Sequence, residues 1–114
     1  MFSNVGFAEI NDVYYCEMNK HVKTIDKQVI EFQNQKFKFK RNLNTLKFGS
    51  GGFFNDHEAP VLKNSGEYFW GGGEWTRFIY LNGKFVFSNL LNINLENEDP
   101  RHQVRSIVAT CELF

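Results

Sequence analysis

The clearest pattern of hydrophobic and polar positions is RFIYLNGKFVFS at residues 77–88, where two alternating apolar runs flank Asn82-Gly83. Asn-Gly accepts the positive φ angles of a type I′ turn, so this segment predicts a β-hairpin. Pairing outward from the turn gives one face made of four aromatic residues, Phe78, Tyr80, Phe85 and Phe87. The other face carries Ile79 and Val86. Because both faces are largely apolar, we expect the hairpin in the middle of a sheet that is covered on both sides.

A second hairpin is predicted at residues 29–40, where apolar positions alternate on either side of the polar triplet Gln33-Asn34-Gln35. Phe37 and Phe39 follow the triplet on one face, and three lysines, Lys36, Lys38 and Lys40, occupy the other. Residues 12–18 and 21–25 form a weaker pair of strands across Asn19-Lys20. The alternation changes phase over residues 41–45, which predicts a bulge or a turn there.

The C-terminal third continues the alternation. Residues 91–96 alternate leucine and isoleucine with polar residues, and residues 104–113 place Ile107, Ala109, Cys111 and Leu113 on one face. Apolar residues do not recur at helical spacing over three turns, although residues 2–10 suit a short helical turn. The sequence therefore predicts an all-β, or β-dominated, single domain over residues 1–114: a compact antiparallel β-sandwich or small barrel of about eight short strands.

Composition and charge exclude some classes of binding partner and some cellular locations. Aromatic residues make up 17% of the chain, 13 of them Phe, which suits a pleated sheet. The chain has 13 basic residues (Lys and Arg) and 13 acidic residues (Asp and Glu), so its formal net charge is zero. No net electric field therefore attracts nucleic acid or anionic lipid, and nucleic acid is disfavoured as a partner. With no apolar run near the ~18 residues of a membrane span, we expect no membrane partner and a cytoplasmic location, in a bacterial cytosol or the host cytosol of a phage or virus.

Metal, cofactor and catalytic motifs are not found. The glycine clusters lack the Gly-Lys-Ser/Thr ending of a phosphate loop. Adjacent residues on an extended chain point to opposite sides, so Asp56, His57 and Glu58 do not converge on one ion. Cys16 and Cys111 are too few for a disulfide framework or a zinc site and are expected as buried, reduced thiols. The sequence thus predicts no metal, no cofactor and no catalytic residue.

Two glycine-rich stretches carry most of the unusual aromatic content: GSGGFF at 49–54 and FWGGGEW at 69–75. Glycine runs lose extra backbone entropy on folding, which makes them poor purely structural connectors. If both stretches emerge at one end of the fold, their rings form one recognition surface; otherwise they plug the core. The candidate binding residues are Phe53, Phe54, Tyr68, Phe69, Trp70 and Trp75. Of the two tryptophans, we expect Trp70 to be exposed and Trp75 to face the core.

The resulting hypothesis is a small intracellular protein-binding module that is not an enzyme. It would inhibit its partner by steric occlusion through the aromatic loops, as a toxin-immunity protein or a phage-encoded blocker of a host system does. Two alternatives stay open. One is a carbohydrate-binding module that stacks sugars on Tyr68, Trp70 and Trp75; the other is a small nuclease that uses two of His21, His57 and His102, or a single-strand binder that uses the lysine strand. The partner is not identified, and a homo-oligomer is compatible with the sequence.

Overall fold

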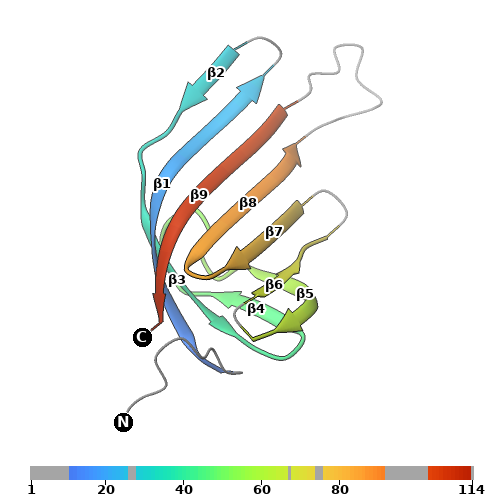
Figure 1. Cartoon of the computed structure of the whole chain (residues 1–114). Helices are drawn as coiled ribbons and strands as arrows, with labels where there is room; N and C mark the ends of the chain where they lie inside the picture. The colour runs from blue at the N-terminus through green and yellow to red at the C-terminus, as the bar shows by residue number, and fades with distance from the viewer. Residues whose placement is uncertain (1–10, 26–27, 67, 74–75, 92–102, 114) are drawn as a thin grey trace.

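The computed structural model describes residues 11–25, 28–66, 68–73, 76–91 and 103–113, the last two residues of 76–91 by their backbone alone. Every regular element in these ranges is a β-strand: β1 (Val13–Ile25), β2 (Gln28–Glu31), β3 (Lys36–Arg41), β4 (Thr45–Phe48), β5 (Glu58–Ser65), β6 (Tyr68–Gly71), β7 (Thr76–Leu81), β8 (Lys84–Leu91) and β9 (Gln103–Leu113). Strands β1 and β3–β9 pair in antiparallel order, and β9 closes on β1 to form a barrel (Figure 1). The all-β prediction and its small-barrel alternative are confirmed.

Strand β1 is a single long strand, so the predicted pairing of residues 12–18 with 21–25 is wrong. It pairs with β9 along nearly its whole length, from Tyr14 opposite Leu113 to Ile25 opposite Gln103. Asn19-Lys20 is not a turn; the register shifts between Met18 and Lys20, which marks a β-bulge. One extra residue preserves the inward direction of the side chains on both sides of it, so both Met18 and His21 are buried.

The predicted hairpin over residues 29–40 is also wrong, because β2 and β3 do not pair with each other. Both pair with β1: β2 lies against residues 22–25 and β3 against residues 13–17. Strands β2 and β3 follow each other along the same side of β1, and Gln33-Asn34-Gln35 separates them. Backbone hydrogen bonds from Phe32 N to His21 O and from Met18 N to Gln35 O lie on either side of this interruption. Alternation correctly predicted which side chains face inward, but it carries no information about the partner strand.

The β7–β8 hairpin is confirmed. Asn82 and Gly83 have φ angles of 46° and 85°, and Leu81 lies opposite Lys84. The aromatic face points into the barrel, but the expectation that both faces are covered is wrong for the described residues. Ile79 is 38% exposed and Leu81 is 50% exposed, because the outer wall of a single-layer barrel faces solvent.

Aromatic rings fill the barrel, as expected for a small barrel whose interior is packed with side chains. Among the described residues, four stacked pairs lie in this core: Phe48–Phe54, Phe69–Tyr80, Tyr14–Phe39 and Phe78–Phe85, with centroid separations of 4.3, 4.8, 4.8 and 6.1 Å. The buried apolar residues are Tyr14, Cys16, Met18, Phe37, Phe39, Leu46, Phe48, Phe54, Ala59, Phe69, Phe78, Tyr80, Phe85, Phe87, Ile107, Ala109 and Cys111. Phenylalanine thus takes the place that leucine usually occupies in a core.

The two ends of the barrel differ. Strands β1, β8 and β9 continue beyond the others at one end, where β2 also pairs with β1 (Figure 1). We call this the extended end. The alternating strand directions place the β4–β5 and β6–β7 connections at this end, and the β3–β4, β5–β6 and β7–β8 connections at the other.

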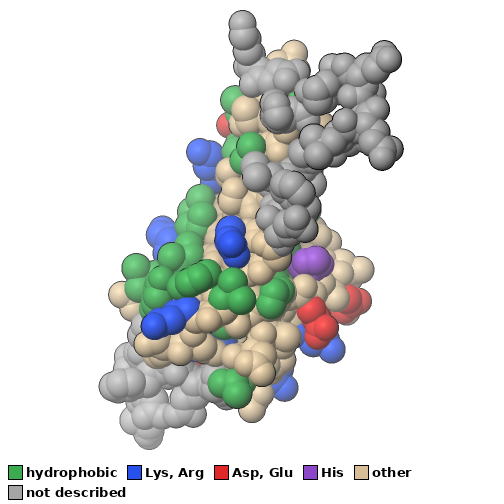
Figure 2. Space-filling model, turned by 90° about the vertical axis from the view of Figure 1, so that its right-hand side faces the viewer, with side chains coloured by type: hydrophobic (Ala, Val, Ile, Leu, Met, Phe, Trp, Pro, Cys, Tyr) green, Lys and Arg blue, Asp and Glu red, His purple; other side chains and the backbone are tan. Residues whose placement is uncertain are grey.

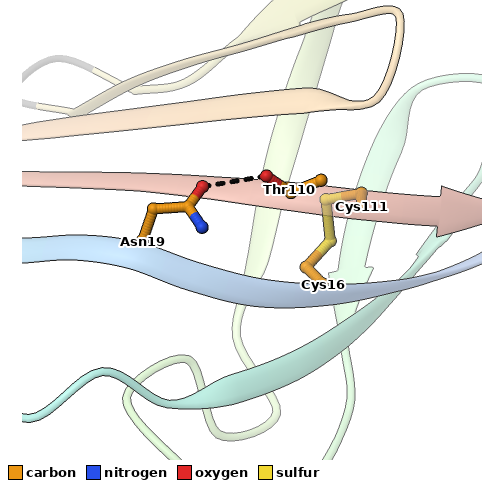
Figure 3. Close-up of a disulfide and its surroundings, with 4 residues drawn as sticks. All are labelled: Cys16, Asn19, Thr110 and Cys111. Carbon is orange, nitrogen blue, oxygen red and sulfur yellow. Dashed lines mark hydrogen bonds between the residues drawn. A yellow bond between two sulfur atoms is a disulfide. The ribbon is translucent and has the colours of Figure 1, made fainter.

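The two cysteines form a disulfide, which corrects the expectation of reduced thiols. Cys16 and Cys111 lie directly opposite each other on β1 and β9, with their sulfur atoms 2.06 Å apart (Figure 3). Beside them, the hydroxyl of Thr110 donates a hydrogen bond to the side-chain oxygen of the bulge residue Asn19 at 2.9 Å. The prediction that both cysteines are buried is confirmed.

Candidate functional site

The predicted aromatic surface is divided among three places. Phe54 and Phe69 are core residues, so they do not belong to any surface. Phe53 is 36% exposed at the extended end. Tyr68 and Trp70 are partly exposed on β6, where they alternate with buried positions and so face outward. Trp75 lies outside the described residues. The two glycine stretches do emerge at the same end, but their described rings do not form one patch.

The close approach of two strands explains the first two glycines of the triplet 71–73. A Cβ built on Gly71 would lie 2.0 Å from the backbone oxygen of Pro60. One built on Gly72, whose φ is +129°, would lie 2.1 Å from the backbone oxygen of Thr76. Both glycines are buried and side chains larger than hydrogen do not fit. These two glycines therefore have a packing role and are not evidence for a flexible recognition tip.

Four apolar side chains form a continuous row across the outer wall. Trp70 lies opposite Ile79, Ile79 opposite Val86, and Val86 opposite Val108. In the next register position, Tyr68 lies opposite Leu81. We call these six residues the outer apolar face. A hollow of about 290 Å³ lies on it, lined by Tyr68, Trp70, Arg77, Phe78, Ile79, Val86 and Ser88.

Lysines surround this face. Lys63 lies opposite Trp70 at one end of the row, Lys20 lies opposite Val108 at the other, and Lys84 lies opposite Leu81. Figure 2 looks at the side of the barrel that carries β5–β7 and shows hydrophobic side chains gathered there with Lys and Arg side chains around them. The outer apolar face thus combines an apolar centre with a cationic rim.

Four side chains form a second group at the extended end, which we call the Arg105 cluster: His21, Phe32, Phe53 and Arg105. An Arg105 guanidinium nitrogen lies 2.6 Å from His21 Nε2, and the guanidinium carbon lies 4.7 Å from the ring centroids of both Phe32 and Phe53. Since guanidinium nitrogens only donate, Nε2 accepts this bond and His21 is neutral. Burial, and then the charge of Arg105, lowers the pKa of His21. The other ring nitrogen, Nδ1, is buried and has no hydrogen-bond partner among the described residues.

A buried arginine closes the other end. Arg41 donates hydrogen bonds to Asn64, to the carbonyl oxygen of Gly66 at 2.6 Å and to the Tyr14 hydroxyl at 3.3 Å. Its guanidinium carbon lies 4.5 Å from the Phe69 ring centroid. Burial raises the pKa of Tyr14 to about 12, and Arg41 opposes that rise. Each guanidinium nitrogen has a partner, so this network is structural rather than a ligand site.

The lysine strand faces outward as predicted, but acidic residues lie beside it. Lys36 pairs with Glu17 across β1–β3, and Lys47 pairs with Glu58 across β4–β5. A hollow of about 650 Å³ next to Lys36 and Lys38 is also lined by Glu17 and Glu112. Carboxylates therefore lie among the lysines of this surface, which disfavours the uniformly basic groove of a single-strand binder.

The described histidines do not form a catalytic pair. His21 is only 4% exposed and contacts Arg105, whereas His57 is exposed in the β4–β5 connection, with its ring 6.3 Å from that of Phe48. His102 lies outside the described residues. Within the described ranges, no three His, Cys, Asp or Glu side chains lie close enough together to hold a metal ion.

Comparisons with known proteins add no identification. In the part of the chain that the structure describes, no helix is long and apolar enough to cross a membrane. Searches against protein-family models, curated proteins and solved structures find no match to this chain.

Proposed function

We propose that this protein acts by binding another protein through the outer apolar face. The observation that carries the proposal is the uninterrupted row from Trp70 to Val108 across four strands, in which Ile79 is 38% exposed and the other three side chains are partly exposed. An apolar patch with a polar rim on a small protein is typical of an interaction site. Tryptophan and tyrosine are also the residue types that most often dominate binding energy in protein interfaces.

The rim indicates the character of the partner. Lys20, Lys63 and Lys84 flank the row, and no carboxylate occupies a position directly opposite one of its six residues within the described strands. A complementary surface would have an apolar centre surrounded by carboxylates. Docking of this kind requires no reacting group, so it suits an inhibitor that occludes its target. A toxin-immunity protein and a phage-encoded blocker of a host system both fit that mode of action.

The test begins with chemical crosslinking in the native host and identification of a stoichiometric partner, followed by titration of purified components. Trp70→Ala is expected to weaken binding about 30-fold or more, which corresponds to about 2 kcal/mol. Leu43→Ala is the matched control, because Leu43 is 63% exposed in the β3–β4 turn and is not one of the six residues of the face. The control is expected to bind like the wild type, and thermal melts of both variants should stay close to it.

Three results would overturn the proposal. Equal partner binding by wild type, Trp70→Ala and Ile79→Ala would show that the face is not used. A homodimer in sedimentation equilibrium that Ile79→Asp dissociates would make the face a self-association surface. Glycan-array binding that Trp70→Ala abolishes would favour the carbohydrate alternative, because Tyr68 and Trp70 lie two residues apart on one face of β6.

A further inference from the structure

A separate surface at the extended end contains cations that have no acidic partner among the described residues. Arg105 lies on β9 and Lys23 on β1, directly opposite each other. Like charges at directly opposed positions destabilise an antiparallel pair. Among the described residues, no carboxylate contacts Arg105, and its only described hydrogen-bond partner is the neutral His21.

The charged groups of the neighbouring strands do not compensate these cations. On β2, Glu31 pairs with Val22, which places it on the opposite face of the sheet from Lys23. On β8, the residue opposite Arg105 is the uncharged Asn89. Burial lowers the pKa of Arg105, as expected for a cation that has lost water without gaining a counter-charge. An anion from outside the described residues would supply the missing charge.

Apolar surface lies next to these cations. Phe32, Phe53 and Ile30 are 37%, 36% and 37% exposed, and Ile30 lies directly opposite Lys23. The Lys23 nitrogen is 5.8 Å from the Phe32 ring centroid, so one ring adjoins both cations. A ligand bound here would contact both apolar side chains and cations. An inorganic anion could pair with the cations, but it has no apolar group to pack against the apolar side chains.

We infer that the Arg105 cluster, with Lys23, binds a carboxylate carried on an apolar group. A guanidinium presents its N–H groups in one plane and grips a carboxylate through two parallel hydrogen bonds. One Arg105 nitrogen is already bound to His21 and the group rests on two phenyl rings, so its position is fixed before a ligand arrives. A fixed donor loses less conformational entropy on binding than a free arginine. The site is distinct from the outer apolar face, since Arg105 and Val108 lie on opposite faces of β9.

Nuclear magnetic resonance titration tests the inference with small probes. Octanoate supplies a carboxylate on a hydrocarbon chain, octanol supplies the chain alone, and inorganic phosphate supplies an anion alone. A capped Leu-Glu-Leu tripeptide distinguishes a protein side chain from a free fatty acid as the source of the carboxylate. Octanoate or the tripeptide is expected to shift the Arg105 Nε–H signal with millimolar affinity, and octanol and phosphate are expected to bind at least tenfold more weakly.

Variants assign the binding to this cluster. Arg105→Gln should reduce the affinity for the binding carboxylate at least tenfold, and Lys23→Gln about threefold. Lys38→Gln removes an exposed lysine from β3 and is the matched control, expected to bind as the wild type. If Arg105→Gln fails to fold, Lys23→Gln carries the test. The inference is overturned if neither carboxylate binds, if octanol or phosphate binds as well as octanoate, or if Lys23→Gln and a folded Arg105→Gln leave the affinity unchanged.

Discussion

Gly71 gives the sharpest test of the packing account of the glycine triplet. Replacing it with alanine would place a Cβ 2.0 Å from the Pro60 oxygen and 2.9 Å from the Val61 Cα. Ordinary contact needs at least 3.4 Å, and both obstacles belong to the β5 backbone rather than to a flexible side chain. Strand β5 or β6 must therefore move by more than about 1 Å, which is a large shift for a well-packed barrel.

The expected cost follows from two contributions. Overpacking of a core costs about 1–3 kcal/mol. The same movement breaks the 2.9 Å hydrogen bond from Gly72 N to the Pro60 oxygen, which contributes about 1 kcal/mol. We expect Gly71→Ala to lower the free energy of unfolding by about 3 kcal/mol, or the melting temperature by roughly 12 °C for a chain of this length.

Urea and thermal denaturation, followed by circular dichroism, measure the effect. Gly73→Ala is the matched control in the same triplet, because an added Cβ there meets no atom within 4 Å. It should leave stability unchanged or raise it by up to about 1 kcal/mol, since alanine restricts the unfolded chain. If Gly71→Ala were as stable as Gly73→Ala, the close approach of β5 and β6 would not be the reason for glycine at position 71.

Three further predictions concern other parts of the barrel. Gly83→Val should cost about 2 kcal/mol or more, because a β-branched residue is disfavoured at a φ of +85°; an unchanged urea midpoint would contradict the turn geometry. The pKa of His21 is lowered below its ordinary 6.5, so the folded state binds fewer protons than the unfolded state. Its contribution to stability should be complete above pH 6.5 and should fall as the pH drops through the lowered pKa; urea midpoints from pH 8 to 5 should show a loss that His21→Asn lacks. The disulfide between Cys16 and Cys111 closes a sequence separation of 95 residues, so reduction should cost up to about 4.7 kcal/mol, and an identical melt in a phosphine reductant would refute that expectation.

Local sequence patterns predicted the strands well because inward and outward positions follow directly from alternation. The lysines of β3 face out, its phenylalanines face in, and Asn82-Gly83 forms the expected turn. Strand pairing depends on contacts between distant residues, and the errors arose there. Cys16 and Cys111 become neighbours only because the first and last strands close the barrel, and no local pattern near either cysteine predicts that closure.

Alternation also made part of the candidate surfaces predictable, because it determines which side chains face outward. Trp70 and Tyr68 face outward, and the outward position of Ile79 and Val86 follows from the hairpin register. The sequence did not reveal that the described residues would leave Ile79 and Leu81 of this face exposed, because that depends on how the strands assemble into a barrel. It also did not reveal the Arg105 cluster, whose members come from β1, the β2–β3 segment, the β4–β5 connection and β9.

Strand length contained information that could have distinguished the bulge in β1 from a turn. The inward residues Met18 and His21 are three positions apart, and both a bulge and a turn produce this spacing, because each changes the phase of alternation. The alternation of β9, however, is unbroken, and in the structure a single, nearly equally long strand satisfies its hydrogen bonds on that side. A turn at Asn19 would leave half of β9 without this partner, whereas one extra residue in β1 keeps the pairing complete. That extra residue also keeps Lys23 on the inward face opposite Arg105, so the proposed carboxylate site depends on the bulge.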